Sequence, residues 1–348
     1  MIIADTLASN HRRTADRVFL GSVVYTGAIT VVWLFFVVTQ YKGPFSFGRY
    51  NIDAQAIGRV LAGLLFFSVL WGWIWYLVRR LLLKRLVGLS DDELRLAFSS
   101  RMNRPFHLSS LLARHSERRI RITDMIGRRG RFATIGLAGF AYLYTRLSAH
   151  PQPEFLTMGL QDTLFDAIVF NWTAVALYYS NGFFARMFYG AQSRLMDGSL
   201  ARANCLLITS LWAGFKFVMV PIGVQMAARF PPKTFAPLFV FIWGSYLVSD
   251  ALSEIVGSLF GNQKLRVWGV GEVNRKSIAG TWACFLGSLA VCFGVVVVNQ
   301  LPLPWVGLAV VVSFSNTLLE LFSPRGTDDF TMATANALLC WAFGVLVY

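Results

Sequence analysis

Long apolar segments separated by short polar ones run through most of the chain, and most of them approach the length of a membrane-crossing helix. A helix of about 20 apolar residues crosses the hydrocarbon core of a bilayer, so each segment is a candidate span. The pattern predicts an all-α fold, a polytopic integral membrane helix bundle with about nine transmembrane helices. The predicted spans are Val18–Thr39, Val60–Val78, Phe132–Leu147, Leu164–Phe184, Ala203–Ala227, Phe235–Ser249 (continuing towards Phe260), Trp282–Val298, Trp305–Phe322 and Thr331–Tyr348.

The composition excludes a soluble protein. Hydrophobic residues make up 55% of the 348 positions and charged residues 14%, against roughly 25% charged residues in a typical soluble domain. Such a chain has too few polar residues to cover a globular exterior, and it is too apolar for a disordered or fibrous protein. Cys205, Cys284, Cys292 and Cys340 lie inside apolar segments without metal-ligand spacing, so we interpret them as core residues.

Positive charge is concentrated in one polar segment between the second and third predicted spans. Residues 79–131, which we call the basic segment, are rich in Arg and Lys within a chain of net charge +14. The positive-inside rule places the basic segment, the N-terminus and the polar stretches at 261–280 and 323–330 in the cytoplasm, and Tyr348 on the other side. Orientation and anionic lipid headgroups explain the charge better than nucleic acid does, and a bacterial inner membrane is the predicted location.

The basic segment has helical periodicity and admits two interpretations. Ser90, Asp91 and Asp92 are typical of an N-cap and an acidic first turn, and a second amphipathic piece begins near Leu108. In one interpretation the segment is a solvated helical connector that lies on anionic headgroups. In the other it contributes directly to substrate binding.

Two acids and two glycines form one stripe near the end of the sixth predicted span. At about 100° per residue, Asp250, Glu254, Gly257 and Gly261 share a helical face. Two carboxylates one turn apart suit Mg²⁺, and glycines allow a phosphate to approach the backbone. The alternative is a close helix–helix contact at small residues, with the acids paired to nearby arginines.

Two further polar stretches are predicted on the same membrane face. The first is a Gly-rich loop with positively charged side chains, which suit phosphate binding. The loop leads into the N-terminus of the seventh predicted span, and a helix N-terminus favours anions. The second joins the eighth and ninth spans and carries acids that suit either helix capping or a Mg²⁺–phosphate site. The residues concerned are Lys264, Arg266, Arg275, Lys276, Ser277, Gly280, Thr281, Glu320, Arg325, Asp328 and Asp329.

The three stretches, in this order, resemble the CTP-dependent polyprenol kinase superfamily, which includes dolichol kinase, phytol kinase and CTP-dependent diacylglycerol kinase. The family motifs are an Asp followed seven and eleven residues later by Gly, a basic loop ending in Lys-Lys-Thr/Ser-x-Glu-Gly, and a Glu, a short turn and Asp-Asn or Asp-Asp-Asn before a helix. In that order, the matching residues are Asp250, Gly257 and Gly261; Arg275, Lys276, Ser277 and Gly280; and Glu320, Asp328 and Asp329.

The resemblance covers residues 235–348 and implies a catalytic transmembrane region there, preceded by an N-terminal transmembrane region at 1–234 that carries the basic segment. It implies a membrane lipid-alcohol kinase that uses CTP or another nucleoside triphosphate, Mg²⁺, and a prenyl-type alcohol or diacylglycerol. We assign the residues as follows: catalytic, Asp250, Asp329 and Glu320; nucleotide-binding, Gly257, Gly261, Lys264, Arg275, Lys276, Ser277, Gly280 and Arg325; metal-binding, Asp250, Glu254, Asp328 and Asp329.

Two other functions stay open at this point. A CTP-dependent cytidylyltransferase forming a CDP-lipid uses the same ion and triphosphate but a phosphate acceptor. A non-catalytic transporter or assembly protein on the same fold is supported by Ala279 and Phe330, which stand where the kinase family has Glu and Asn.

Overall fold

The protein is almost entirely α-helical in its computed structural model, which confirms the predicted all-α class. The structure describes residues 2–39, 58, 62, 66, 70–99, 108–131, 134, 167–270, 273–324 and 326–347. Its helical elements are α1 (Ile2–Thr39), α3 (Gly72–Leu82), η2 (Leu83–Val87), α4 (Asp91–Ser99), α5 (Leu108–Leu112), helices at 117–131 and Ala167–Leu177, α8 (Phe183–Gln192), η3 (Leu195–Leu200), α9 (Ala201–Arg229), α10 (Pro232–Phe239), η4 (Val240–Gly244), α11 (Ser245–Phe260), α12 (Ile278–Val298), α13 (Leu303–Phe322) and α14 (Asp328–Val347).

Five helices in the described part of the chain are long and apolar enough to cross a membrane. The protein therefore has the helices of a membrane protein, but nine spans are not confirmed. The predicted span Phe132–Leu147, apart from residue 134, and residues 60, 61, 63–65 and 67–69 of the predicted span Val60–Val78 lie outside the described residues. The predicted span Leu164–Phe184 contains a helix that ends at Leu177. The five candidate spans are Asn10–Phe35, Lys233–Phe260, Ile278–Val298, Leu303–Phe322 and Phe330–Val347.

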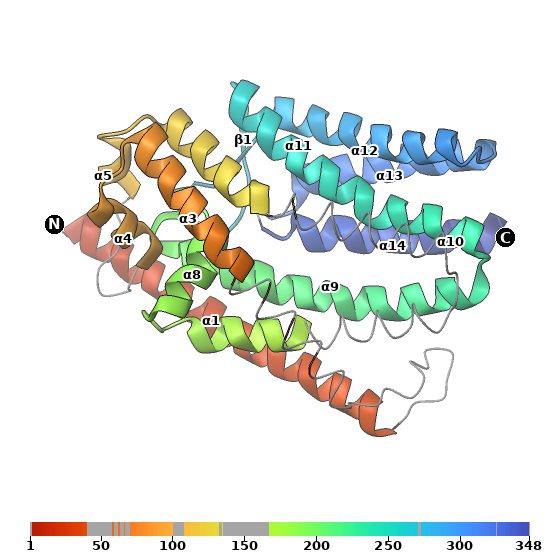
Figure 1. Ribbon diagram of the computed structural model, residues 1–348, viewed down its shortest axis with the longest axis horizontal. Coiled ribbons are helices and arrows are strands. Elements are labelled where there is room, and N and C mark those ends of the chain that lie inside the picture. Colours follow the sequence, from red (N-terminus) through yellow and green to blue (C-terminus); the bar gives the residue numbers. More distant parts are fainter. Residues whose placement is uncertain are drawn as a thin grey trace.

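Helices α11 to α14 lie side by side along the long axis of the molecule, with α9 beside α14 and α1 beside α9 (Figure 1). Their shared core is apolar and includes the fully buried side chains of Phe241 and Trp305. Helices α11 and α12 approach each other closely because Gly280 has no side chain. A Cβ at Gly280 would lie 2.6 Å from the carbonyl oxygen of Ser253, so a larger residue would push the helices apart.

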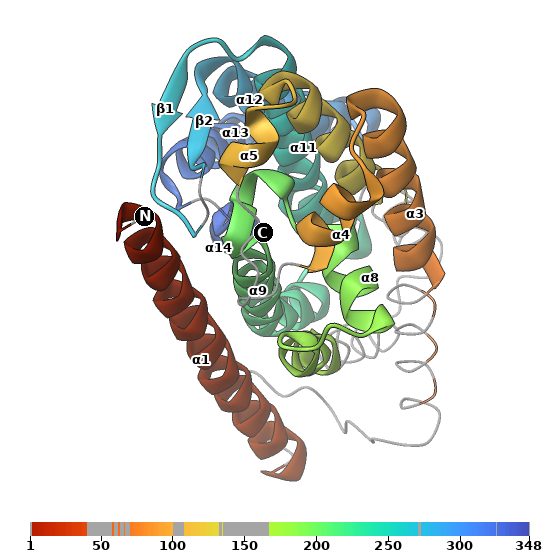
Figure 2. The same cartoon turned by 90° about the vertical axis from the view of Figure 1, so that its left-hand side faces the viewer.

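A short antiparallel hairpin links α11 to α12 at one end of the bundle. Strand β1 (Lys264–Arg266) pairs with β2 (Arg275–Ser277), with Lys264 opposite Ser277. The Ser277 hydroxyl accepts a hydrogen bond from the Gly280 amide at 3.1 Å, so Ser277 caps the N-terminus of α12. Figure 2 looks onto this end, where the hairpin, α5 and η3 gather near the ends of α11 to α13.

The basic segment is helical, as the sequence predicts, and packs against the same end of the bundle. Ser90 and Glu93 exchange hydrogen bonds between side chain and backbone, which confirms the predicted helix start at α4. The amphipathic piece breaks after α5, and residues 117–131 form a separate helix, which we call the basic helix. It packs tightly on α3 because Gly127 and Gly130 face Arg79 and Trp75 at distances that a Cβ would not allow.

Candidate functional site

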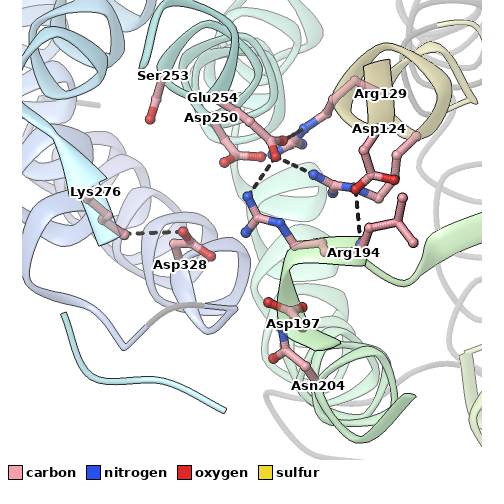
Figure 3. A network of polar contacts seen from close by, with 12 residues as sticks. Asp124, Arg129, Arg194, Asp197, Asn204, Asp250, Ser253, Glu254, Lys276 and Asp328 are labelled. Carbon is pink, nitrogen blue, oxygen red and sulfur yellow. Dashed lines mark hydrogen bonds and ion pairs between the residues drawn. The ribbon is translucent and has the colours of Figure 1, made fainter. Parts of the chain in front are cut away.

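Charged side chains from six separate segments meet at the end of the bundle that carries the hairpin (Figure 3). Asp250 and Glu254 extend from α11, Glu320 from α13, and Asp328 is the first residue of α14. The cations come from β2, from the basic helix and from the turn before η3. The predicted convergence of the α11 acids with the loop before α14 is therefore present for Asp250, Glu254, Glu320 and Asp328.

Lys276 binds the acids on the α13–α14 side. Its ammonium nitrogen lies 3.3 Å from Asp328 Oδ2 and 3.7 Å from Glu320 Oε1, and it donates to the Glu320 carbonyl oxygen. The Glu320 carboxylate also accepts hydrogen bonds from Ser253 at 2.9 Å and Thr281 at 3.3 Å. These five groups come from α11, β2, α12, α13 and α14, so this half of the site is held together by contacts between separate elements.

Three arginines surround Glu254 on the other side. Arg194 Nη2 lies 2.7 Å from Glu254 Oε1, and Arg128 and Arg129 also form ion pairs with the Glu254 carboxylate. Arg129 reaches Asp250 as well, with 2.5 Å between Nη1 and Oδ2. The Glu254 side chain is 10% exposed, so this network is largely shielded from water.

A second, fully buried ion pair holds the arginines in place. Arg79 donates from Nε to Asp124 Oδ1 at 2.9 Å and from Nη2 to the Ser193 carbonyl oxygen at 2.6 Å. Asp124 also accepts a hydrogen bond from the Leu195 amide at 3.1 Å. The pair thus ties α3, the basic helix and the turn that carries Arg194 into one support.

Oppositely charged neighbours keep Asp328 and Arg194 ionised at neutral pH. Burial raises the pKa of Asp328, but the positive charges of Lys276, Arg194 and Arg129 lower it by a larger amount. The net pKa of Asp328 therefore lies below the ordinary value. Burial lowers the pKa of Arg194, but Glu254 and Asp197 raise it more, so the net pKa lies above the ordinary value. Both groups therefore stay charged across the physiological range.

The predicted glycine positions serve helix packing in this structure. A Cβ at Gly257 or Gly261 would lie 2.6 Å from the Ser277 side chain, and Gly280 faces α11. The contact between α11 and α12 therefore depends on these small residues, as the packing alternative expects. Lys264 and Arg275 lie on exposed positions of the hairpin, away from the buried ion pairs.

Some predicted site residues lie outside what the structure describes, namely Arg325 and the side chain of Asp329. Sequence reasoning in turn missed Arg128, Arg129 and Arg194 as site residues. The available signal was Gly127 and Gly130, whose spacing in an arginine-rich helix indicates that this helix packs closely against the protein.

The acids of the site suit a Mg²⁺ ion that a phosphate ligand also holds. Among the described residues, no group of three or more His, Cys, Asp or Glu side chains gathers closely enough to hold a metal ion. Mg²⁺ bound with a nucleotide needs only one or two carboxylates, and Asp250 and Asp328 lie close enough to interact electrostatically. These two side chains are therefore the best candidates to hold such an ion.

Comparison with known proteins adds no assignment, because no protein-family model, no curated protein and no solved structure matches this chain.

Proposed function

We propose that the protein is a membrane phosphotransferase that moves a phosphoryl group from a nucleoside triphosphate, by its resemblance CTP, to the hydroxyl of a membrane lipid. A prenyl-type alcohol or a diacylglycerol suits the apolar bundle. One observation carries the proposal: Asp250, Asp328 and Lys276 come from separate elements and meet at the end of an apolar helical bundle. A lipid can reach such a site from the bilayer and a nucleotide from the cytoplasm.

The acidic and the basic residues of the site would have different roles in phosphoryl transfer. Asp250 and Asp328 would hold Mg²⁺, which neutralises the charge that develops on the transferred group. Lys276 would bind the triphosphate, and a carboxylate of the site would take the hydroxyl proton. The lipid oxygen then bonds to the γ-phosphorus while the bond to the β-phosphate oxygen breaks, which leaves a lipid phosphate and a nucleoside diphosphate.

The test is transfer of label from CTP carrying ³²P at the γ-position to a panel of lipid alcohols by the purified protein. We expect labelled lipid phosphate from the wild type, and a loss of at least about 100-fold in Asp250→Asn, because a buried charge-assisted contact contributes about 3 kcal/mol. Asp91→Asn is the matched control, since Asp91 is exposed and belongs to a surface ion pair. Full transfer by Asp250→Asn would remove Asp250 from the site.

A second candidate, the cytidylyltransferase, is favoured by one specific observation. The three arginines beside Asp250 suit an acceptor that carries its own phosphate. With phosphatidic acid as the acceptor, this enzyme releases pyrophosphate from CTP and forms a CDP-lipid, whereas the kinase forms a lipid phosphate. Neither product from any lipid would point to the transporter or assembly protein.

A further inference from the structure

The arginine side of the site has more positive than negative charge. Three guanidinium groups meet the single carboxylate of Glu254, and only Arg129 of these also pairs with Asp250. Three cations therefore face two acids on this side, and the third positive charge interacts with Asp197 and Asp328 near Arg194. The arginine half taken by itself is positive, so an anion suits it better than a cation.

One of these arginines, Arg128, also retains hydrogen-bonding capacity. Arg128 is 7% exposed, and among the described residues its Nε has no hydrogen-bond partner. Figure 3 shows the Arg194 guanidinium between Glu254 and Asp328, at the centre of the charged cluster. Each guanidinium presents a planar fork of N–H donors that matches the oxygens of a phosphate group.

The helix and the turn that carry these arginines are anchored by contacts that do not involve Glu254. The pair of Arg79 and Asp124 anchors the basic helix to the turn before Arg194, and Gly127 allows that helix to pack on Arg79. Arg128, Arg129 and Arg194 therefore stay together even when their carboxylate partner changes. This fixed arrangement is what an anion-binding site needs before its ligand arrives.

We infer that Arg128, Arg129 and Arg194 form the phosphate-binding half of the site, and that Glu254 is the internal anion that occupies it in the absence of ligand. The inference rests on the proposed function in that the phosphate belongs to a substrate. The phosphate group comes either from the nucleotide or from a phospholipid headgroup. The N-terminal two thirds of the chain thereby contributes directly to substrate binding.

This role of Glu254 differs from that of a metal ligand, and the two roles predict opposite results for one substitution. If Glu254 competes with phosphate for the arginines, Glu254→Gln tightens phosphate binding because the competing charge is gone. If Glu254 holds Mg²⁺, the same substitution weakens Mg²⁺-dependent binding and leaves Mg²⁺-free binding unchanged.

The experiment measures binding of inorganic tripolyphosphate, without Mg²⁺, to the full-length protein in nanodiscs by isothermal titration calorimetry. We expect Arg129→Gln and Arg194→Gln each to weaken binding at least about tenfold, since a charge-assisted hydrogen bond carries a factor of about 10 to 100. Arg121→Gln is the matched control on the same helix, because Arg121 pairs with Glu117 and should change binding less than about twofold. Glu254→Gln should bind more tightly than the wild type.

Wild-type binding that is absent, or that is unchanged by both arginine substitutions, would overturn the inference, as would binding in Glu254→Gln that is weaker than or equal to that of the wild type. If a Gln variant misfolds, Arg129→Lys and Arg194→Lys replace it, because they keep the positive charge but lose the planar guanidinium group. Tripolyphosphate binding by these variants equal to that of the wild type would also overturn the inference. Replacing tripolyphosphate with vesicles that contain phosphatidic acid, and then with neutral lipid, identifies the source of the phosphate. Because none of these readouts needs turnover, a failure of the kinase assay leaves this result interpretable.

Discussion

Substitution of the buried pair of Arg79 and Asp124 gives the sharpest test of how the site is supported. The Arg79 side chain is 0% exposed and the Asp124 side chain 5%, and Arg79 also donates to the carbonyl oxygens of Gly190 and Ser193. Removing one partner of a buried pair leaves the other charge without compensation, which costs about 3–5 kcal/mol. We therefore expect Asp124→Asn and Arg79→Met each to lower the free energy of unfolding by about that amount.

The exposed ion pair between Arg80 and Asp91 supplies a matched control. Arg80 pairs with Asp91 at 2.8 Å, but the two side chains are 34% and 48% exposed. An exposed pair contributes about 0.2–1 kcal/mol, so Asp91→Asn should lower the free energy of unfolding by no more than that. The two substitutions are chemically identical, and only burial distinguishes them.

The assay is unfolding of the detergent-solubilised protein by titration with SDS, followed by tryptophan fluorescence. Arg79→Met combined with Asp124→Leu should recover part of the loss, because neither charge is then left buried alone. A loss below about 1 kcal/mol in Asp124→Asn, or an equal loss in Asp91→Asn, would refute the reasoning that this pair holds the basic helix in place.

Three further substitutions test other parts of the structure. Gly280→Ala should destabilise the protein by about 1–3 kcal/mol, because the new Cβ would meet the Ser253 carbonyl oxygen. Gly294→Ala on the same helix is the control and should be neutral or slightly stabilising, because a Cβ there would meet nothing within 4 Å. SDS titration compares the two variants. Asn316→Ala should cost about 1–2 kcal/mol by the same assay, because Asn316 donates to Ser245 and Ser288 inside the bundle. The pKa of Asp328 is lower in the folded protein than in the unfolded chain. Ionised Asp328 therefore stabilises the fold above the ordinary Asp pKa, and this contribution is lost as the pH falls through the pKa of the folded state. Melting temperatures from pH 7 to pH 3 should fall less steeply in Asp328→Asn than in the wild type, and parallel curves would contradict this.

Hydrophobic periodicity was sufficient to predict the C-terminal helices. The predicted spans Trp282–Val298 and Trp305–Phe322 correspond to α12 and α13, because apolar length alone defines such helices. The helix at Ala167–Leu177 is shorter than predicted because the chain turns after it, at Ser180, Asn181 and Gly182. The end of such a helix depends on the turn residues that follow the apolar segment, and hydrophobic periodicity does not take these residues into account.

The candidate site was only half predictable, for a different reason. Asp250, Lys276 and Asp328 each lie in a short stretch with its own motif, so a local pattern indicates each of them separately. The partners of Glu254 are separated from it by 126, 125 and 60 positions for Arg128, Arg129 and Arg194, and no local pattern connects residues so far apart. The interpretation of the basic segment as a solvated connector fails for Arg79, Arg128 and Arg131, which are buried.

The balance of charge in the cluster indicates why the protein keeps it. Arg128, Arg129, Arg194 and Lys276 face Asp250, Glu254, Glu320 and Asp328, so four cations meet four acids at the end of an apolar bundle. Buried ion pairs contribute little to stability compared with well-packed apolar residues, so stability alone does not explain eight charges here. A ligand that carries both a metal ion and phosphates can replace both kinds of partner together: the metal replaces cations at the acids, and phosphate replaces acids at the arginines. A cluster neutral in itself is then ready for a ligand of mixed charge, and neither half alone would bind it as well.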